Sequence, residues 1–204
     1  MQHQDIEIYS PLLDKWSPRL ANLTGPRTEF CALVLDQILF VIGGINGQGD
    51  NFDVQGLELN SMKWASFPSM KIGRSSFACA KFGNNLLVAG GRGQIQGQAK
   101  VETLAAVEYL DLHLNKWKDL TPMNQARADF AMISHRNEER EIITAFGGFH
   151  WQHPLDSIEN LRPDKSLEFV PASFKLKQPV SNFALVAVPD NFASFTNCGK
   201  IKNS

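Results

Sequence analysis

The sequence has almost no excess of charge of either sign. Its 20 Lys and Arg residues balance 21 Asp and Glu residues, which gives a formal net charge of −1. A balanced chain has no general attraction to nucleic acid or to an anionic membrane, so neither is expected as a partner. Long apolar runs are also missing, since no stretch approaches the roughly 18 consecutive apolar residues that cross a bilayer. The first residues, MQHQD, lack the basic and apolar segments of a secretory leader.

Cysteine is scarce as well. Cys31, Cys79 and Cys198 cannot all pair with one another, and each lies in an apolar, strand-like context. We therefore expect small, reduced core residues, which are typical of an intracellular protein, and the predicted location is the cytoplasm. The remaining composition, 43% hydrophobic and 20% charged, fits a globular protein with a substantial core.

What the sequence does contain is a repeat. Gly-Gly occurs at 43–44, 90–91 and 147–148, each time after an apolar run. An Arg precedes each run, and a Phe follows that Arg by three residues. The Phe positions are 30, 77 and 130, and Phe183 marks a fourth copy in which Val180 stands at the Arg position; the spacings are 47, 53 and 53 residues. A period near 50 residues predicts a repeat architecture in which each unit packs against its neighbours.

Each unit contains four short segments typical of β-strands. In the first unit these are FCALVL, ILFVI, VQGLEL and WASF, rich in β-branched and aromatic residues. Turn residues separate them, such as Asp36-Gln37 and Asn60-Ser61. One four-stranded sheet leaves both faces wet, so such sheets must stack, and radial stacking gives a β-propeller.

The pattern resembles the kelch repeat, in which an apolar run ends in Gly-Gly and an aromatic residue and a Trp follow. The matching residues are Gly43-Gly44 with Leu57 and Trp64, then Gly90-Gly91 with Tyr109 and Trp117, and, with both aromatics lost, Gly147-Gly148 with Asn160 and Leu167. The resemblance covers essentially the whole chain. It implies an all-β fold, a kelch-type propeller of about four four-stranded blades.

The blade boundaries follow from the same register. Complete blades are expected at approximately 27–70, 74–123 and 127–173. Residues 5–23 contain the back half of a repeat and residues 180–199 the front half, so we predict a fourth blade shared between the two ends. Closure of this kind removes exposed sheet edges and favours a monomer. Kelch propellers usually have five to seven blades, so the alternatives are a short open array that completes itself by oligomerising and a degenerate, truncated relative.

The repeated arginines are the first candidate site. The first strand of a propeller blade is innermost, and its start lies at the same rim as the end of the second strand. Arg27, Arg74 and Arg127 are therefore expected around one mouth of the central channel. Arginines at this position contact acidic peptides in some kelch proteins, so the resemblance implies a protein or peptide partner that is acidic. The alternative is that Glu7, Glu108 and Glu159, with Gln55 at the matching place, pair with these arginines and consume their charge.

The loops that follow the Gly pairs reach the same rim and supply the remaining candidates. These are Asn46, Arg92, His150, Trp151 and His153. Loops on a rigid scaffold commonly carry recognition. For the segment FHWQH we favour an aromatic anchor for a partner over a metal site, because two histidines alone make a weak metal motif. The other alternative is that Trp151 folds over the edge of its blade.

Motifs of catalysis are missing from the sequence. It has no phosphate-binding glycine loop, nucleophile elbow or helical zinc motif, so we expect no enzyme activity, no cofactor and no metal. The predicted function is a protein-binding scaffold or adaptor that uses one rim. The alternatives are a small carbohydrate-active, epimerase-like enzyme with rim Arg, Glu and His residues, and a degenerate repeat without a specific ligand.

Overall fold

The protein is built from β-strands. The computed structural model describes residues 4–17, 21–94, 101–137, 140–162 and 166–186, and each of the regular elements in these residues is a strand. The predicted all-β class is therefore confirmed.

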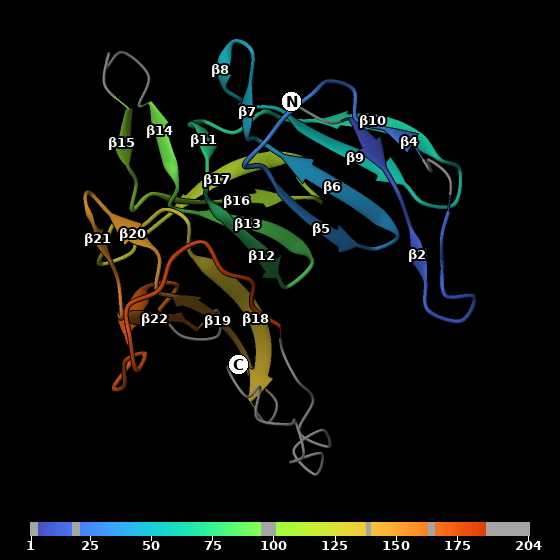
Figure 1. Ribbon diagram of the computed structural model, residues 1–204. Coiled ribbons are helices and arrows are strands. Elements are labelled where there is room, and N and C mark those ends of the chain that lie inside the picture. Colours follow the sequence, from blue (N-terminus) through green and yellow to red (C-terminus); the bar gives the residue numbers. More distant parts are fainter. Residues whose placement is uncertain (1–3, 18–20, 95–100, 138–139, 163–165, 187–204) are drawn as a thin grey trace.

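Three antiparallel four-stranded sheets form most of the structure (Figure 1). In each sheet the strands lie side by side in chain order. Sheet 1 consists of β5 (Cys31–Leu35), β6 (Ile38–Ile42), β9 (Val54–Glu58) and β10 (Lys63–Phe67); sheet 2 of β12 (Ala78–Phe82), β13 (Asn85–Ala89), β16 (Val107–Asp111) and β17 (Lys116–Leu120); sheet 3 of β18 (Ala131–Asn137), β19 (Arg140–Phe146), β22 (Ile158–Leu161) and β23 (Phe169–Pro171). Each of the three predicted complete blades contains one of these sheets.

Tight turns fix the register within each sheet. Leu35 pairs with Ile38, so Asp36 and Gln37 form a two-residue turn, and both have positive φ, 49° and 63°. Positive φ at both central residues matches the right-handed twist of the flanking strands. Gly83 and Asn84 form a second two-residue connection, between β12 and β13, because Phe82 pairs with Asn85; of these two only Gly83 has positive φ, 58°.

Short hairpins extend the sheets at one edge, after each Gly pair (Figure 1). β7 (Ile45–Asn46) pairs with β8 (Gly49–Asp50), and β20 (Phe149–His150) pairs with β21 (His153–Pro154). Between them, β11 (Gly73–Ser75), β14 (Arg92–Gln94) and β15 (Val101–Thr103) form a three-stranded sheet. These elements make up the rim on which the candidate site lies.

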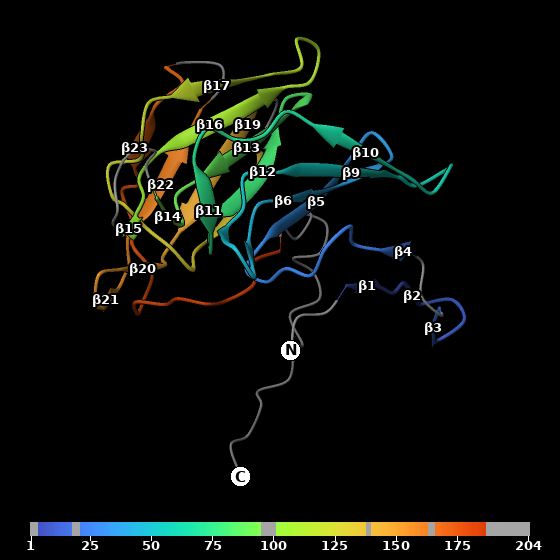
Figure 2. The same cartoon turned by 90° about the horizontal axis from the view of Figure 1, so that it is seen from above.

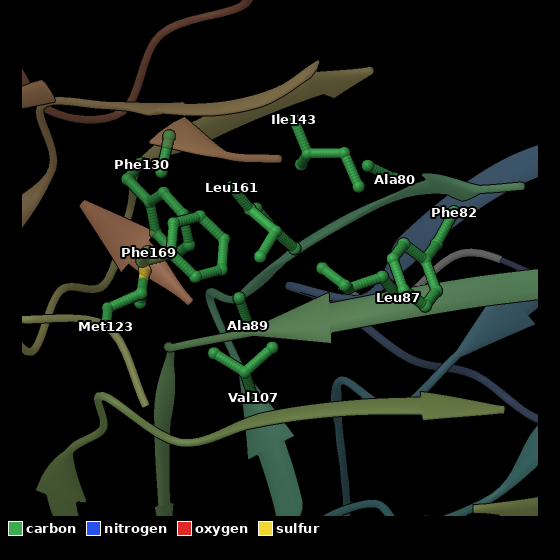
Figure 3. Close-up of a cluster of buried hydrophobic side chains, with 12 residues drawn as sticks. Ala80, Phe82, Leu87, Ala89, Val107, Met123, Phe130, Ile143, Leu161 and Phe169 are labelled. Atoms are coloured by element: carbon green, nitrogen blue, oxygen red, sulfur yellow. The ribbon is translucent and has the colours of Figure 1, made fainter. Parts of the chain in front are cut away.

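Two apolar clusters bind the sheets to one another. Phe40, Ile42, Leu86, Val88 and Trp117 belong to the cluster between sheets 1 and 2. The cluster between sheets 2 and 3 includes Leu87, Ala89, Ile143 and Leu161 (Figure 3). Successive side chains of a strand point to opposite faces, so β13 supplies both clusters. The sheets are therefore joined face to face, and sheet 2 is covered on both sides.

The cysteines differ from the expectation. Cys31 in β5 and Cys79 in β12 form a disulfide, with their Cα atoms 6.0 Å apart. The innermost strands of neighbouring sheets converge, and this brings two residues 48 positions apart within bonding distance. The prediction that these two cysteines are reduced is wrong, and Cys198 lies outside the described residues.

The N-terminal strands pair with one another. β1 (Asp5–Ile6) pairs with β4 (Ala21–Asn22), and β2 (Tyr9–Ser10) pairs with β3 (Lys15–Trp16). Figures 1 and 2 place them beside sheet 1, where Thr24 donates a hydrogen bond to Gln55. Val180 forms a bridge with Leu155, but residues 187–199 of the predicted fourth blade lie outside the described residues. The shared fourth blade therefore stays a prediction.

Candidate functional site

The repeated arginines are buried. Arg27, Arg74 and Arg127 have 4%, 0% and 0% of their surface exposed. The structure thus contradicts the prediction that they contact a partner at the rim, because no part of Arg74 or Arg127 is open to solvent. The expectation of an acidic partner was based on arginines exposed at the rim, and these arginines are buried.

Each guanidinium group is instead bound inside its own repeat. Arg74 donates to the carbonyl of Gly90 at 2.9 Å and to Glu108 Oε1 at 2.5 Å. Arg127 contacts Gly147 and Glu159 in the same way, at 2.6 Å each. The other carboxylate oxygen of Glu108 accepts a hydrogen bond from the amide of Lys71, in the segment that leads in from sheet 1. The Arg74–Glu108 ion pair therefore links sheet 2 to the segment that enters it from sheet 1.

Structural pairing was the alternative, and it is confirmed for Glu108 and Glu159. Arg27 differs, because its partner is Asp53, bound through both oxygens at 2.8 and 2.9 Å, rather than Glu7. Gln55, at the place that matches the glutamates, donates to Asp53 instead. Burial lowers the pKa of Arg74 and Arg127, and the paired glutamates oppose that change.

The Gly pairs join neighbouring repeats. The amide of Gly91 donates to the carbonyl of Arg127 at 2.8 Å, and Gly44 and Gly148 contact Arg74 and Val180 in the same way. Gly90 and Gly91 have φ of 63° and 91°, and a Cβ on Gly90 would lie 2.5 Å from the Arg127 carbonyl oxygen. Glycine is required here because a backbone passes where a side chain would stand.

The FHWQH segment forms the tip of a hairpin. Trp151 lies in its turn, with φ 56° and 64% of its surface exposed. The His150 ring meets the Trp151 ring edge-on at 6.1 Å, and His150 pairs across the hairpin with His153. Trp151 therefore does not fold over the edge of its sheet. In the part of the chain that the structure describes, no three His, Cys, Asp or Glu side chains gather as metal ligands.

Arg92 and Asn46 lie on the neighbouring rim hairpins. The Arg92 side chain is 43% exposed and forms an ion pair with Asp129 at 2.5 Å. Asn46 is half-buried, and its side-chain oxygen accepts a hydrogen bond from the amide of Gln48. Arg92 is thus partly available at the surface, whereas Asn46 shapes its own turn.

A row of polar residues, not identified from the sequence, lies two positions after each repeated Arg and, in the fourth copy, two positions after Val180. They are Glu29, Ser76, Asp129 and, in the fourth copy, Asn182, all with φ between 51° and 56°. Main-chain hydrogen bonds of 2.8 to 3.0 Å run from each residue to the previous one, from Asn182 back to Glu29. These residues and the Phe that follows each of them line a pocket of about 290 Å³. The signal was present in the sequence, since each repeat has a polar residue at this position.

A second hollow lies beside this pocket, on the rim. It has a volume of about 450 Å³ and lies between the β7–β8 hairpin and the sheet of β11, β14 and β15. We call it the rim groove, and the first hollow the axial pocket. Ser75 lines the rim groove and the adjacent Ser76 lines the axial pocket, so the two are neighbours.

Comparison with known proteins identifies the repeat. Residues 73–124, which include all of sheet 2, match the family described as the kelch motif. The chain belongs to the kelch-repeat family. It is 31% identical over 140 residues to Kelch-like protein 26 of Danio rerio, an alignment that covers 69% of this chain and 22% of that protein. Kelch-like protein 23 of Homo sapiens is 26% identical over 166 residues, covering 79% and 27%.

The kelch fold is also found in a solved structure. The protein YjhT superposes with a TM-score of 0.65 at 16% identity, covering 82% of this chain and 57% of that one. The kelch chain described here thus spans about a quarter of the two Kelch-like proteins and little more than half of YjhT. Within the described residues, no helix has the length and apolarity needed to span a membrane.

Proposed function

We propose that this kelch chain is a protein-binding module that recognises its partner through the rim hairpins. The observation that carries the proposal is Trp151, a large aromatic side chain that stays mostly exposed at the tip of a hairpin. Tryptophan is strongly enriched among the residues that dominate interface energies. The rim groove lies between the other rim elements, the β7–β8 hairpin and the sheet of β11, β14 and β15, and adds a concave surface to the rim.

The enzyme alternative draws no support from the repeated charged residues. An epimerase-like site needs Arg and Glu side chains that face a bound sugar. Arg74, Arg127, Glu108 and Glu159 are all buried and paired with one another. Protein recognition does not need these four residues to be exposed, because it uses the loops instead.

The test compares partner capture by the full chain and by rim variants. Trp151→Asn removes the ring, and asparagine tolerates the positive φ of this position better than alanine does. We expect a captured protein to bind the variant about 2 kcal/mol more weakly, roughly 30-fold in Kd. Leu114→Ala, at a residue 58% exposed between β16 and β17 on the opposite edge, is the matched control. Equal binding by all three proteins would exclude the rim.

A further inference from the structure

The rim groove has apolar and acidic walls. Ile45, Phe52 and Val101 supply the apolar part, and Asp50, Ser75 and Arg92 the polar part. Its volume of about 450 Å³ is in the range of pockets that hold small ligands or single peptide side chains. The groove therefore fits a short segment of a partner, with one apolar and one charged feature.

The side chains around the rim groove and the axial pocket carry an excess of negative charge. The described residues that line the rim groove and the axial pocket include three carboxylates, Asp50, Glu29 and Asp129, and one cation, Arg92. Arg92 pairs with Asp129, so its charge is already compensated. Two carboxylates, Asp50 and Glu29, remain without a Lys or Arg partner among the described residues.

Among the described residues, both remaining carboxylates accept hydrogen bonds from serine hydroxyl groups. Ser76 donates to Glu29 Oε2 at 2.6 Å, and Ser75 donates to Asp50. Burial raises the pKa of Asp50, and the negative charge of Glu29 raises it further, while the Ser75 hydrogen bond opposes both effects. The two carboxylates are thus close enough to repel each other, and a cation placed between them would relieve that repulsion.

We propose that the rim groove binds a basic side chain, Lys or Arg, of a partner peptide, with the cation at Asp50 and Glu29 and an adjacent apolar residue on Ile45, Phe52 and Val101. The proposal rests on the proposed function and names the chemistry of the partner. It reverses the charge expected from the sequence: the arginines that suggested an acidic partner are buried, and the open charges are carboxylates. Charge-assisted hydrogen bonds to a carboxylate pair would give such a ligand orientation as well as affinity.

An organic cation suits this geometry better than a bare metal ion. Calcium takes six to eight oxygen ligands. In the described ranges of the chain, no group of three or more potential acidic, His or Cys ligands comes together at the groove or elsewhere. The apolar side chains of Ile45, Phe52 and Val101 would also contact the ligand only if it has an apolar group next to its charge.

The experiment titrates three short peptides into the full-length, ¹⁵N-labelled chain. They are acetyl-Leu-Lys-Leu-amide and the same peptide with Gln or Glu in place of Lys. We expect the Lys peptide to shift the amide signals of Gly49, Asp50, Gly73 and Ser75 in a saturable way. The Gln peptide should bind at least tenfold more weakly, and the Glu peptide should not bind. Equal binding of the Lys and Gln peptides, or stronger binding of the Glu peptide, would overturn the proposal.

The decisive variant is Asp50→Asn with Glu29→Gln, which keeps shape and removes charge. It should weaken the Lys peptide at least tenfold, whereas Glu168→Gln, at an exposed carboxylate ahead of β23, should leave it unchanged. Retained binding by the double variant contradicts the assignment. The proposed function is tested separately: a captured partner that is lost with Trp151→Asn but retained by the double variant supports rim recognition and refutes this ligand chemistry.

Discussion

Arg74 is a charged side chain without solvent contact, and its cost is offset by Glu108 and two carbonyl groups. Its Nη1 donates to the carbonyls of Gly90 and Ala106 at 2.9 and 3.0 Å. Glu108 is equally buried, so removing one partner leaves an uncompensated charge in the interior. Breaking a buried pair from one side typically costs about 3–5 kcal/mol, whereas replacing both partners by apolar residues costs less.

We therefore predict that Arg74→Met lowers the free energy of unfolding by about 3–5 kcal/mol. The double variant Arg74→Met with Glu108→Leu should lose less than the sum of the two single variants. Guanidinium unfolding of the four proteins measures this coupling. Additive losses would mean that the carbonyl contacts of Arg74, rather than its ion pair, carry its contribution.

Asp50, unlike Arg74, has no oppositely charged partner among the described residues to offset its burial. Burial and the Glu29 charge hold its pKa above the ordinary value of 3.8, so the ionised form is less favourable in the folded than in the unfolded protein. Such a group costs stability above its folded pKa, and the cost disappears as the pH falls below the unfolded value. Asp50→Asn should therefore raise the Tm at pH 7 and leave it unchanged near pH 3. A lower Tm at pH 7 would show that the Ser75 hydrogen bond outweighs the burial of charge.

At the scale of the structural element, each Gly pair lies where the second strand of a sheet ends and the chain enters the rim. A Cβ on Gly91 would lie 2.6 Å from the Ser75 carbonyl oxygen, and its φ of 91° is unfavourable for other residues. Both obstacles are backbone features that cannot move aside. Gly47, in the β7–β8 turn, has no atom within 4 Å of the same position and no positive φ.

We predict that Gly91→Ala destabilises the protein by at least about 2 kcal/mol, since strained backbone alone costs roughly 1–3 kcal/mol. Gly47→Ala should be nearly neutral. Thermal unfolding of both variants checks the difference. Similar Tm values would mean that the rim backbone can rearrange around a methyl group.

At the scale of the whole molecule, the strands and turns that recur in each repeat could be predicted from the sequence, whereas contacts between distant residues could not. The Gly pairs and Phe anchors recur in register, so the three sheets and their turns could be predicted from local patterns. Charge partners depend on distances across a sheet, which explains why Asp53, rather than Glu7, binds Arg27. The disulfide required knowledge that β5 and β12 converge. The polar residues of the axial pocket were missed because Glu29, Ser76, Asp129 and Asn182 share polarity but not residue type.

Sheet 2 packs against sheet 1 on one face and against sheet 3 on the other, so each of the two interfaces can be destabilised without the other. Leu86 and Leu87 are adjacent in β13 and fully buried, yet Leu86 belongs to the cluster with sheet 1 and Leu87 to the cluster with sheet 3. In repeat proteins each unit contacts only its neighbours, so stability divides into terms for each interface. Each Leu→Ala change should cost about 2–5 kcal/mol.

We predict that the two variants loosen different parts of the protein. Leu86→Ala should increase amide hydrogen exchange in β6, which supplies Phe40 and Ile42 to the first cluster. Leu87→Ala should do so in β19, which supplies Ile143 and Ala145 to the second. Hydrogen exchange read by mass spectrometry distinguishes the two patterns, because exchange follows the free energy of local opening. If both variants raise exchange equally in β6 and β19, the three sheets unfold as one cooperative unit and the interfaces are not separable.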